Sequence, residues 1–247
     1  MESQFHKIVN RMINTAQCTD HVCSICNSSG CDDLVKTSDW SWAHPACAEK
    51  ARVERLQKNI KEALSKRGVR ARYLDCSFDN YKPKDESSKK ASVAMRNVDS
   101  TFTGSIFLTS ARSGTGKTHL AVATMRNLLW SGFTDVLFVS SPYLFLEIKN
   151  SFNGDESESK VINNYCNVKF LIIDDIGVEK VSEWAMQIWY MIIDRRYSEM
   201  TPTIYTSNLS IGDVAESLGK RIASRLSSGY VLTLDSNDHR LENRPKL

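Results

Sequence analysis

The sequence predicts an α/β domain with a central parallel sheet, preceded by a small cysteine-rich domain. Three observations lead to this class. Between residues 100 and 235, short apolar runs typical of strands alternate with segments of helical spacing. Each run is apolar on both faces, which favours a parallel sheet covered by helices on both sides. Four of the seven cysteines fall within residues 18–31, and this bunching favours a metal site over a disulfide framework.

The expected elements follow one another in a regular order. Strands are expected at 105–109, 136–140, 169–175, 201–208 and 230–235. Helices are expected at 118–130, at 141–152 and after Ser182, which can cap a first turn ahead of an apolar face (Trp184, Ile188, Trp189 and Ile192). Residues 82–90 (KPKDESSKK) are charged and rich in serine, which predicts an exposed loop or linker. We therefore expect two domains, 1–72 and 73–247.

Composition places the chain among ordinary globular proteins. It has 247 residues, of which 41% are hydrophobic and 25% charged, and its net charge of +3 is too small to indicate nucleic acid. The positive charge is concentrated, however, because residues 50–72 hold nine Lys or Arg against two Glu, a local excess of 9 − 2 = +7. Neither a signal peptide nor an apolar stretch of membrane-spanning length is present, so a cytoplasmic protein without membrane contact is expected. Thiols stay reduced there, and Cys76 and Cys166 are expected to be buried.

A glycine-rich loop between the strand at 105–109 and the next helix is the main sign of function. It consists of Ala111, Arg112, Ser113, Gly114, Thr115, Gly116, Lys117 and Thr118, and His119 follows it. Such a loop curls its backbone N–H groups around phosphate oxygens at a helix N-terminus. Lys117 would reach the β and γ phosphates of ATP, and the Thr118 hydroxyl would ligate Mg²⁺. A chance match is the alternative, but the flanking strand and helix argue against it.

Two carboxylates end the strand at 169–175. Asp174 can hold Mg²⁺ opposite the phosphate loop, and Asp175 is placed to polarise an attacking water. The alternative is a surface turn after a core strand, where paired Asp is common. With a phosphate loop in the same chain, the two acids predict the second half of a nucleoside-triphosphate site; the loop alone could also belong to a kinase or a GTPase.

Several motifs in one order, IIDDIG, SEW, RRY, PTIYTSN and RIASRL, resemble the DnaC/IstB branch of the AAA+ ATPases over residues 73–240. The resemblance implies the three-layer AAA+ fold, with residues 73–247 forming an ATPase domain that lacks a full C-terminal lid. Members of this branch are loaders of the replicative helicase or transposition helpers. The expected function is an ATP-dependent helicase loader in replication initiation, with slow, DNA-stimulated hydrolysis.

The same resemblance assigns four further residues. Asn208 is expected to be the sensor of the γ-phosphate and water, and Arg225 to be the finger that reaches the ATP of a neighbouring subunit. Arg221 would lie beside Arg225, and Arg240 resembles a second-sensor arginine. A turn residue for Asn208, and surface salt bridges for the arginines, are the alternatives. Copies would assemble side by side with ATP at their interfaces.

A structural zinc site is expected in the first domain. Cys23-x₂-Cys26 and His44-x₂-Cys47 are separated by 17 residues, a spacing at which two knuckles supply four ligands. Cys18 or Cys31 could replace one ligand, and His44 could be an ordinary exposed histidine.

After Cys47, an apolar stripe (Val53, Leu56, Ile60 and Leu64) predicts a helix surrounded by basic residues. It is a solvated helix packed on the zinc module, or it contacts nucleic-acid phosphates or a partner protein. The resemblance implies that residues 1–72 hold a DnaB-like replicative helicase and that single-stranded DNA meets the segment between 140 and 170, where Tyr143 and Lys149 are candidates.

Two rival functions remain open. One is an IstB-like transposition helper that coats double-stranded DNA, and the zinc start and the SEW and RRY motifs favour the loader over it. The other is a non-catalytic regulator of the helicase, against which the intact Lys117, Asp174, Asp175 and Asn208 argue.

Overall fold

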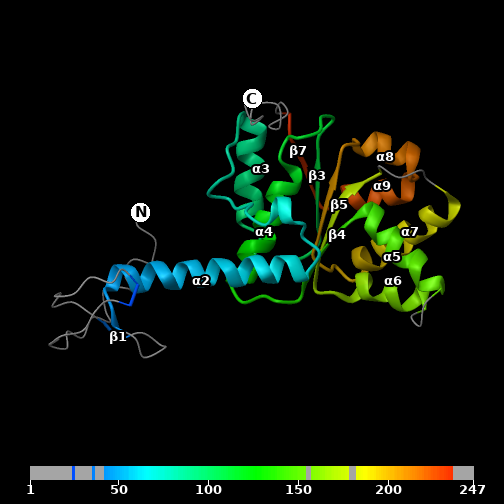
Figure 1. Ribbon diagram of the computed structural model, residues 1–247. Coiled ribbons are helices and arrows are strands. Elements are labelled where there is room, and N and C mark those ends of the chain that lie inside the picture. Colours follow the sequence, from blue (N-terminus) through cyan, green and yellow to red (C-terminus); the bar gives the residue numbers. More distant parts are fainter. Residues whose placement is uncertain (1–23, 26–34, 37–41, 154–156, 178–181, 236–247) are drawn as a thin grey trace, which may run out of the picture. The chain divides into compact units, whose positions relative to one another are not determined.

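The computed structural model describes residues 24–25, 35–36, 42–153, 157–177 and 182–235, and these form parts of two compact units, 1–59 and 60–247 (Figure 1). In the first unit, β1 (Val35–Lys36) pairs antiparallel with β2 (Trp42–Ala43). The division falls inside α2 (Pro45–Lys66). Among the described residues, no helix is long and apolar enough to cross a membrane.

The second unit is built on a five-stranded parallel sheet, as predicted. Its strand order is β4-β5-β6-β3-β7, with bounds Val136–Ser140, Phe170–Ile176, Thr203–Ser207, Ser105–Thr109 and Tyr230–Thr233. The strand β5, which lies between the edge strand β4 and the central strand β6, is buried along its apolar run, and β7 forms the more exposed edge. β6 lies between β3 and β5, so the strand that leads into the glycine-rich loop and the strand that ends in two acids are both its neighbours.

Alternating side chains divide the core into two layers, one on each face of the sheet. Ile172 of β5 and Ile204 of β6 pack with α4 (Lys117–Trp130) and α3 (Glu86–Arg96). Ile173 and Tyr205, the next residues along, pack on the opposite face. That face is covered by α5 (Ser141–Asn150), α6 (Glu158–Asn167), α7 (Glu183–Ser198) and α9 (Lys220–Ser227) (Figure 1). The helix α8 (Ile211–Ser217) precedes α9, and short 3₁₀ turns lie at η1 (Ala71–Tyr73) and η2 (Ser151–Asn153).

Ser182 caps α7 as expected. Its hydroxyl accepts a hydrogen bond from the backbone N–H of Ala185 at 3.2 Å, which satisfies one of the free donors of the first turn. Ile188, Trp189 and Ile192 are buried on the face predicted from their spacing.

The prediction of a loop at 82–90 is wrong for residues 86–90, because α3 begins at Glu86. Asp85 and Ser88 form a reciprocal capping box. The Asp85 carboxylate accepts the Ser88 N–H at 2.7 Å, and the Ser88 hydroxyl accepts the Asp85 N–H at 3.1 Å. Ala91 and Met95 continue from Ser88 on a buried face. Capping and burial therefore outweigh the polar composition that suggested a loop.

Residues 60–72 pack with the second unit. Leu64 and Val69 are buried in the core layer that contains α4, and Ile60 lies against it. The Arg67 Nε donates to the carbonyl of Thr134 at 3.0 Å. The contacts thus divide the chain after Asn59, whereas the expected first domain extends to residue 72.

A buried arginine, Arg196, binds the backbone carbonyls at the C-terminal end of α6. The Arg196 guanidinium is 1% exposed and donates to the carbonyls of Tyr165, Cys166 and Val168 at 2.9, 3.1 and 2.8 Å. It also donates to the carbonyl of Pro202 and to the Thr203 hydroxyl at 2.7 Å each. Burial lowers the pKa of this guanidinium to about 10. One side chain therefore joins the end of α6 to the start of β6.

Candidate nucleotide-binding site

The glycine-rich loop lies at the carboxyl end of β3, and Lys117 is the first residue of α4. Gly114 and Gly116 have φ angles of +71° and +96°, which a residue with a Cβ rarely adopts. A Cβ at Gly116 would lie 2.7 Å from a ring carbon of Tyr81. Both backbone conformation and space thus require glycine at residue 116, and the loop has the shape that a phosphate needs.

Lys117 is only 5% exposed and its ammonium group is held by three oxygens. It donates to Asn208 Oδ1 at 2.8 Å, to the Arg112 carbonyl at 3.2 Å and to Thr115 Oγ1 at 3.5 Å. Asn208 directly follows β6, whose last residue Ser207 lies opposite Thr109 of β3. The sheet topology therefore brings the predicted sensor into contact with the predicted phosphate lysine.

Asp174 and Thr118 also meet, as a shared magnesium site requires. The Thr118 hydroxyl lies 2.9 and 3.1 Å from the two carboxylate oxygens of Asp174, and the Thr206 hydroxyl donates to Oδ1 at 2.6 Å. Burial, with repulsion from Asp175, raises the pKa of the Asp174 carboxyl to about 6, although the two hydroxyls and Lys117 act in the opposite direction. A divalent cation would favour the ionised form, so these oxygens fit Mg²⁺.

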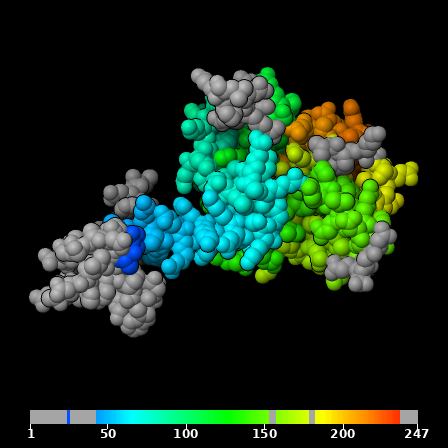
Figure 2. Space-filling model, in the orientation of Figure 1, coloured from blue at the N-terminus to red at the C-terminus, as the bar shows by residue number. Residues whose placement is uncertain are grey.

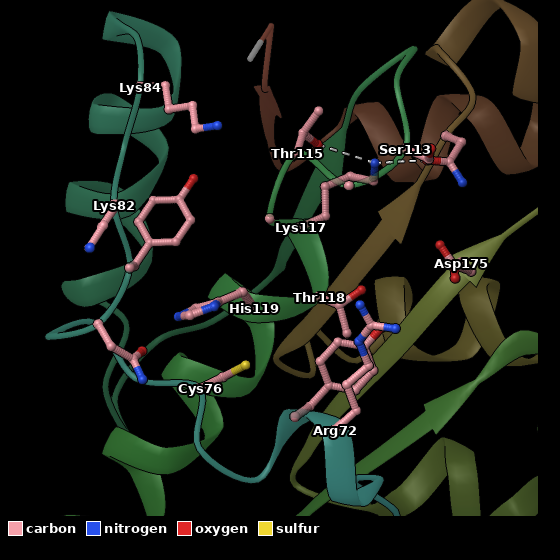
Figure 3. Close-up of a pocket in the computed structure, with 16 residues that line it drawn as sticks. Arg72, Cys76, Lys82, Lys84, Ser113, Thr115, Lys117, Thr118, His119 and Asp175 are labelled. Carbon is pink, nitrogen blue, oxygen red and sulfur yellow. Dashed lines mark hydrogen bonds between the residues drawn. The ribbon is translucent and has the colours of Figure 1, made fainter. Parts of the chain in front are cut away.

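Asp175 has the unusual φ angle of +60°. Its N–H donates to Thr206 Oγ1 at 2.9 Å, and its side chain lines the same cavity as Lys117 and Asn208 (Figure 3). The two consecutive acids therefore occupy different environments, with Asp174 buried beneath the loop and Asp175 at the cavity surface.

The cavity has a volume of about 840 Å³, enough for a nucleotide. Ser113, Gly114, Thr115, Gly116, Lys117, Thr118 and His119 line one part of it. The opposite wall was not predicted, and it consists of Arg72, Tyr73, Cys76, Asn80, Tyr81, Lys82 and Lys84. Figure 2 shows this segment in cyan on the surface of the second unit, and Figure 3 shows Lys84 and Cys76 across the cavity from Thr115 and Lys117. Ala111 and Arg112 belong to the loop but do not line the cavity.

Contacts with α4 fix this wall in place. His119 Nε2 lies 2.9 Å from the carbonyl of Ser77, and its ring centroid is 5.2 Å from that of Tyr81. Burial lowers the pKa of the His119 imidazole, so the ring is neutral near pH 7. Cys76 is buried as expected, and burial raises the pKa of its thiol to about 11, which makes it unreactive. Cys166 is buried too.

The predicted arginines lie elsewhere. Arg225 lines a different cavity of about 430 Å³, together with Ser105 and Thr203, the first residues of β3 and β6. This is the opposite end of the strands from the phosphate loop, so Arg225 cannot reach the nucleotide of its own chain. Arg221, one turn earlier on α9, lines an open groove beside Tyr190. Arg240 lies outside the described residues.

Only half of the predicted zinc ligands can be placed. His44 and Cys47 lie at the start of α2 and are partly exposed. Cys23 and Cys26, like Cys18 and Cys31, lie outside the described residues. Within the part of the chain that the structure describes, no group of three or more His, Cys, Asp or Glu is arranged to hold a metal ion.

The predicted DNA candidates lie on α5, outside the nucleotide cavity. Tyr143 is 53% exposed, and the guanidinium carbon of Arg70 lies 4.1 Å from its ring centroid. Lys149 Nζ lies 5.4 Å from the ring centroid of Trp184, near the exposed side chain of Phe152. Each of the two candidates therefore belongs to a pair of one basic and one aromatic side chain.

In the parallel sheet, β6 lies between the strand that leads into the phosphate loop and the strand that ends in Asp174. The loop residue Thr118 contacts Asp174, and Lys117 contacts Asn208. This arrangement defines a P-loop ATPase of the AAA+ class. The comparisons give the family. The family model of the IstB-like ATP binding protein matches residues 51–228, and the chain belongs to this family.

Named relatives cover most of the chain. The replicative helicase loader DnaC of Buchnera aphidicola subsp. Baizongia pistaciae is 35% identical over 190 residues, which are 74% of this chain and 77% of that protein. The replicative helicase loader DnaC of Escherichia coli strain K12 is 33% identical over 187 residues, 74% of this chain and 76% of that protein. A crystal structure of the DnaC helicase loader matches with a TM-score of 0.59 and 26% identity, and it covers 67% of this chain and all of that one (100%).

Proposed function

We propose that this chain is an ATP-dependent loader of a DnaB-like replicative helicase, acting in the cytoplasm at replication initiation. ATP binding and hydrolysis would switch it between assembly and release. The main support is the geometry of the site, where Lys117 contacts Asn208 and Thr118 contacts Asp174. The chain that carries this site is 33–35% identical to proteins named as replicative helicase loaders.

The phosphate tail of ATP would lie on the backbone N–H groups of residues 113–118, at the N-terminus of α4. Lys117 would exchange its contact with Asn208 for phosphate oxygens. Thr118 and Asp174 would hold Mg²⁺, which neutralises charge on the phosphates when bound. Asp175, at the cavity surface, would orient the water that attacks the γ-phosphate, and Asn208 would contact the same group.

Hydrolysis would require two copies of the chain. Arg225 lies at the far end of the strands from its own phosphate loop, so it can meet only a neighbour's nucleotide. We therefore place copies side by side, with ATP at each interface and Arg225 stabilising charge on the γ-phosphate. Arg221 would lie beside it, and Arg240 would act as a second sensor. Turnover would be slow and stimulated by single-stranded DNA.

The remaining surfaces would hold the partners. Tyr143, Lys149 and Arg70 combine stacking and positive charge, which suits single-stranded DNA. A zinc module formed by Cys23, Cys26, His44 and Cys47, with the basic helix α2, would bind the helicase.

The decisive experiment is co-purification with the replicative helicase of the source organism, with and without ATP. Capture by the wild-type chain that changes with nucleotide supports a loader, and Lys117→Ala, which should lose ATP binding, is the matched variant. Capture of a transposase on double-stranded DNA would instead indicate a transposition helper, in line with the family's name. Helicase capture without any ATP hydrolysis on single-stranded DNA would indicate a non-catalytic regulator.

A further inference from the structure

The side chain of Arg225 is the centre of a polar cluster between α7 and α9. Its Nε donates to Asp194 Oδ1 at 2.5 Å, and its Nη2 contacts the same carboxylate oxygen. Its Nη1 donates to the carbonyl of Arg221 at 3.1 Å. The guanidinium is thus held by an acid on one edge and by its own helix on another.

Two tyrosines of α7 complete the cluster. The guanidinium carbon lies 5.0 Å from the ring centroid of Tyr190 and 5.7 Å from that of Tyr197, and Nη2 donates to the Tyr190 hydroxyl at 3.4 Å. Tyr190, Asp194 and Tyr197 are spaced by four and three residues, so they share one face of α7. The Arg225 and Asp194 side chains are 22% and 33% exposed, which makes the pair accessible yet shielded in part from solvent.

This ordering matters for a group that acts on a neighbour. An arginine side chain has several rotatable bonds, and fixing it when two copies meet would reduce the gain from the contact. A guanidinium fixed beforehand avoids that loss and presents its charge in one orientation.

We propose that Asp194 is a positioning residue, whose carboxylate holds Arg225 in the orientation that meets the nucleotide of the neighbouring copy. The inference rests on the proposed function, since it requires Arg225 to act between copies. The competing explanation is that the pair merely joins α7 to α9. Those helices already share apolar packing through Ile222, Leu226 and Ile193, so a mere joint would affect stability alone.

The test uses the full chain in its assembled, ATP-hydrolysing state. Asp194→Asn should lower kcat about tenfold to a hundredfold, with the KM and Kd for ATP within about twofold of wild type. Asp194→Glu restores a carboxylate and should recover part of the loss. Glu199→Gln is the matched control, because Glu199 forms an exposed ion pair with Arg195 at the end of the same helix.

A double-mutant cycle separates the outcomes. Arg225→Ala should lower kcat about a thousandfold, and adding Asp194→Asn should cause no further loss. If Arg225→Ala leaves kcat unchanged, Arg225 does not act on the nucleotide of a neighbouring copy, and the positioning role of Asp194 is refuted as well. If Arg225→Ala lowers kcat while Asp194→Asn does not, or the two losses multiply, only the positioning role is overturned. Retained ATP binding verifies that each variant is folded.

Discussion

The stability of the ligand-free protein and the proposed function favour opposite protonation states of the Asp174 carboxyl. It is buried beneath the phosphate loop with a pKa raised to about 6, so its ionised form is disfavoured in the ligand-free protein. Ionisation is nevertheless what a magnesium ligand needs. The two hydroxyls and Lys117 compensate the charge of the ionised carboxyl only in part, and a divalent cation bound with the nucleotide would complete that compensation.

Asp174→Asn should therefore stabilise the ligand-free protein while abolishing hydrolysis. Because the folded pKa lies above the unfolded value, the carboxylate weakens folding at pH 7, and this cost disappears as the pH falls from about 6 to about 4. We expect a gain of about 1 to 3 kcal/mol at pH 7 that vanishes near pH 4. Denaturant unfolding across that range measures it, with the exposed Asp79→Asn as control. A gain that grows toward low pH would contradict the assignment.

In the proposed site, Asn208 and a bound nucleotide would compete for the ammonium group of Lys117. Asn208→Ala removes a hydrogen bond to a charged group, so Lys117 becomes more available to phosphates. ADP, which has no γ-phosphate for Asn208 to contact, should bind about threefold to tenfold more tightly, since such a bond contributes on the order of 1 kcal/mol. ATP turnover should fall at the same time. Equilibrium titration of ADP tests this, and Asn164→Ala, at an exposed residue of α6 that does not line the cavity, is the control. Weaker ADP binding by Asn208→Ala would refute the prediction.

At the scale of elements, local patterns predicted the strands and the glycine-rich loop. Strands such as β5 are apolar on both faces, and the loop's glycines are fixed by backbone conformation, so each signal is contained within about ten residues. The wall at 72–84 carries no such pattern. It is irregular backbone held from a distance, because Arg126 of α4 donates to the carbonyls of Leu74 and Cys76. No periodicity in the sequence records that contact.

The helix α3 was not predicted because its charged, serine-rich composition suggested a loop. The opposing signal was the capping pair Asp85 and Ser88. Removing that signal should cost stability in proportion to the donors left unsatisfied. Asp85→Ala is expected to lower the free energy of unfolding by about 1 kcal/mol. Chemical denaturation checks this value, and the exposed Lys89→Ala serves as control. An unchanged midpoint would mean that packing of Ala91 and Met95 alone maintains the helix.

At the scale of the whole molecule, residues 60–247 contain both core layers and the complete nucleotide cavity. The order of motifs predicted an ATPase domain at 73–247, whereas the contacts extend the second unit to residue 60. The sequence could not determine how the first unit folds, because its predicted zinc ligands come from two separate segments of the chain. The two units therefore predict separable activities.

Zinc and nucleotide binding should be independent of each other. We expect about one zinc ion per chain by elemental analysis, lost in the double variant Cys23→Ser, Cys26→Ser. That variant should lose helicase capture and keep its affinity for ATP. The matched control is Cys76→Ser, Cys166→Ser, which alters two cysteines of the second unit and should retain the metal. Zinc retained by the first variant would exclude this ligand set.

The buried guanidinium of Arg196 has a consequence for how the molecule opens. It connects the last carbonyls of α6 to the start of β6. Separating the two segments would break the hydrogen bonds of a buried guanidinium to several backbone carbonyls. Amide hydrogens of α6 and β6 should accordingly exchange with deuterium in a single step, at the rate of global unfolding, while the cavity wall at 72–84 exchanges earlier.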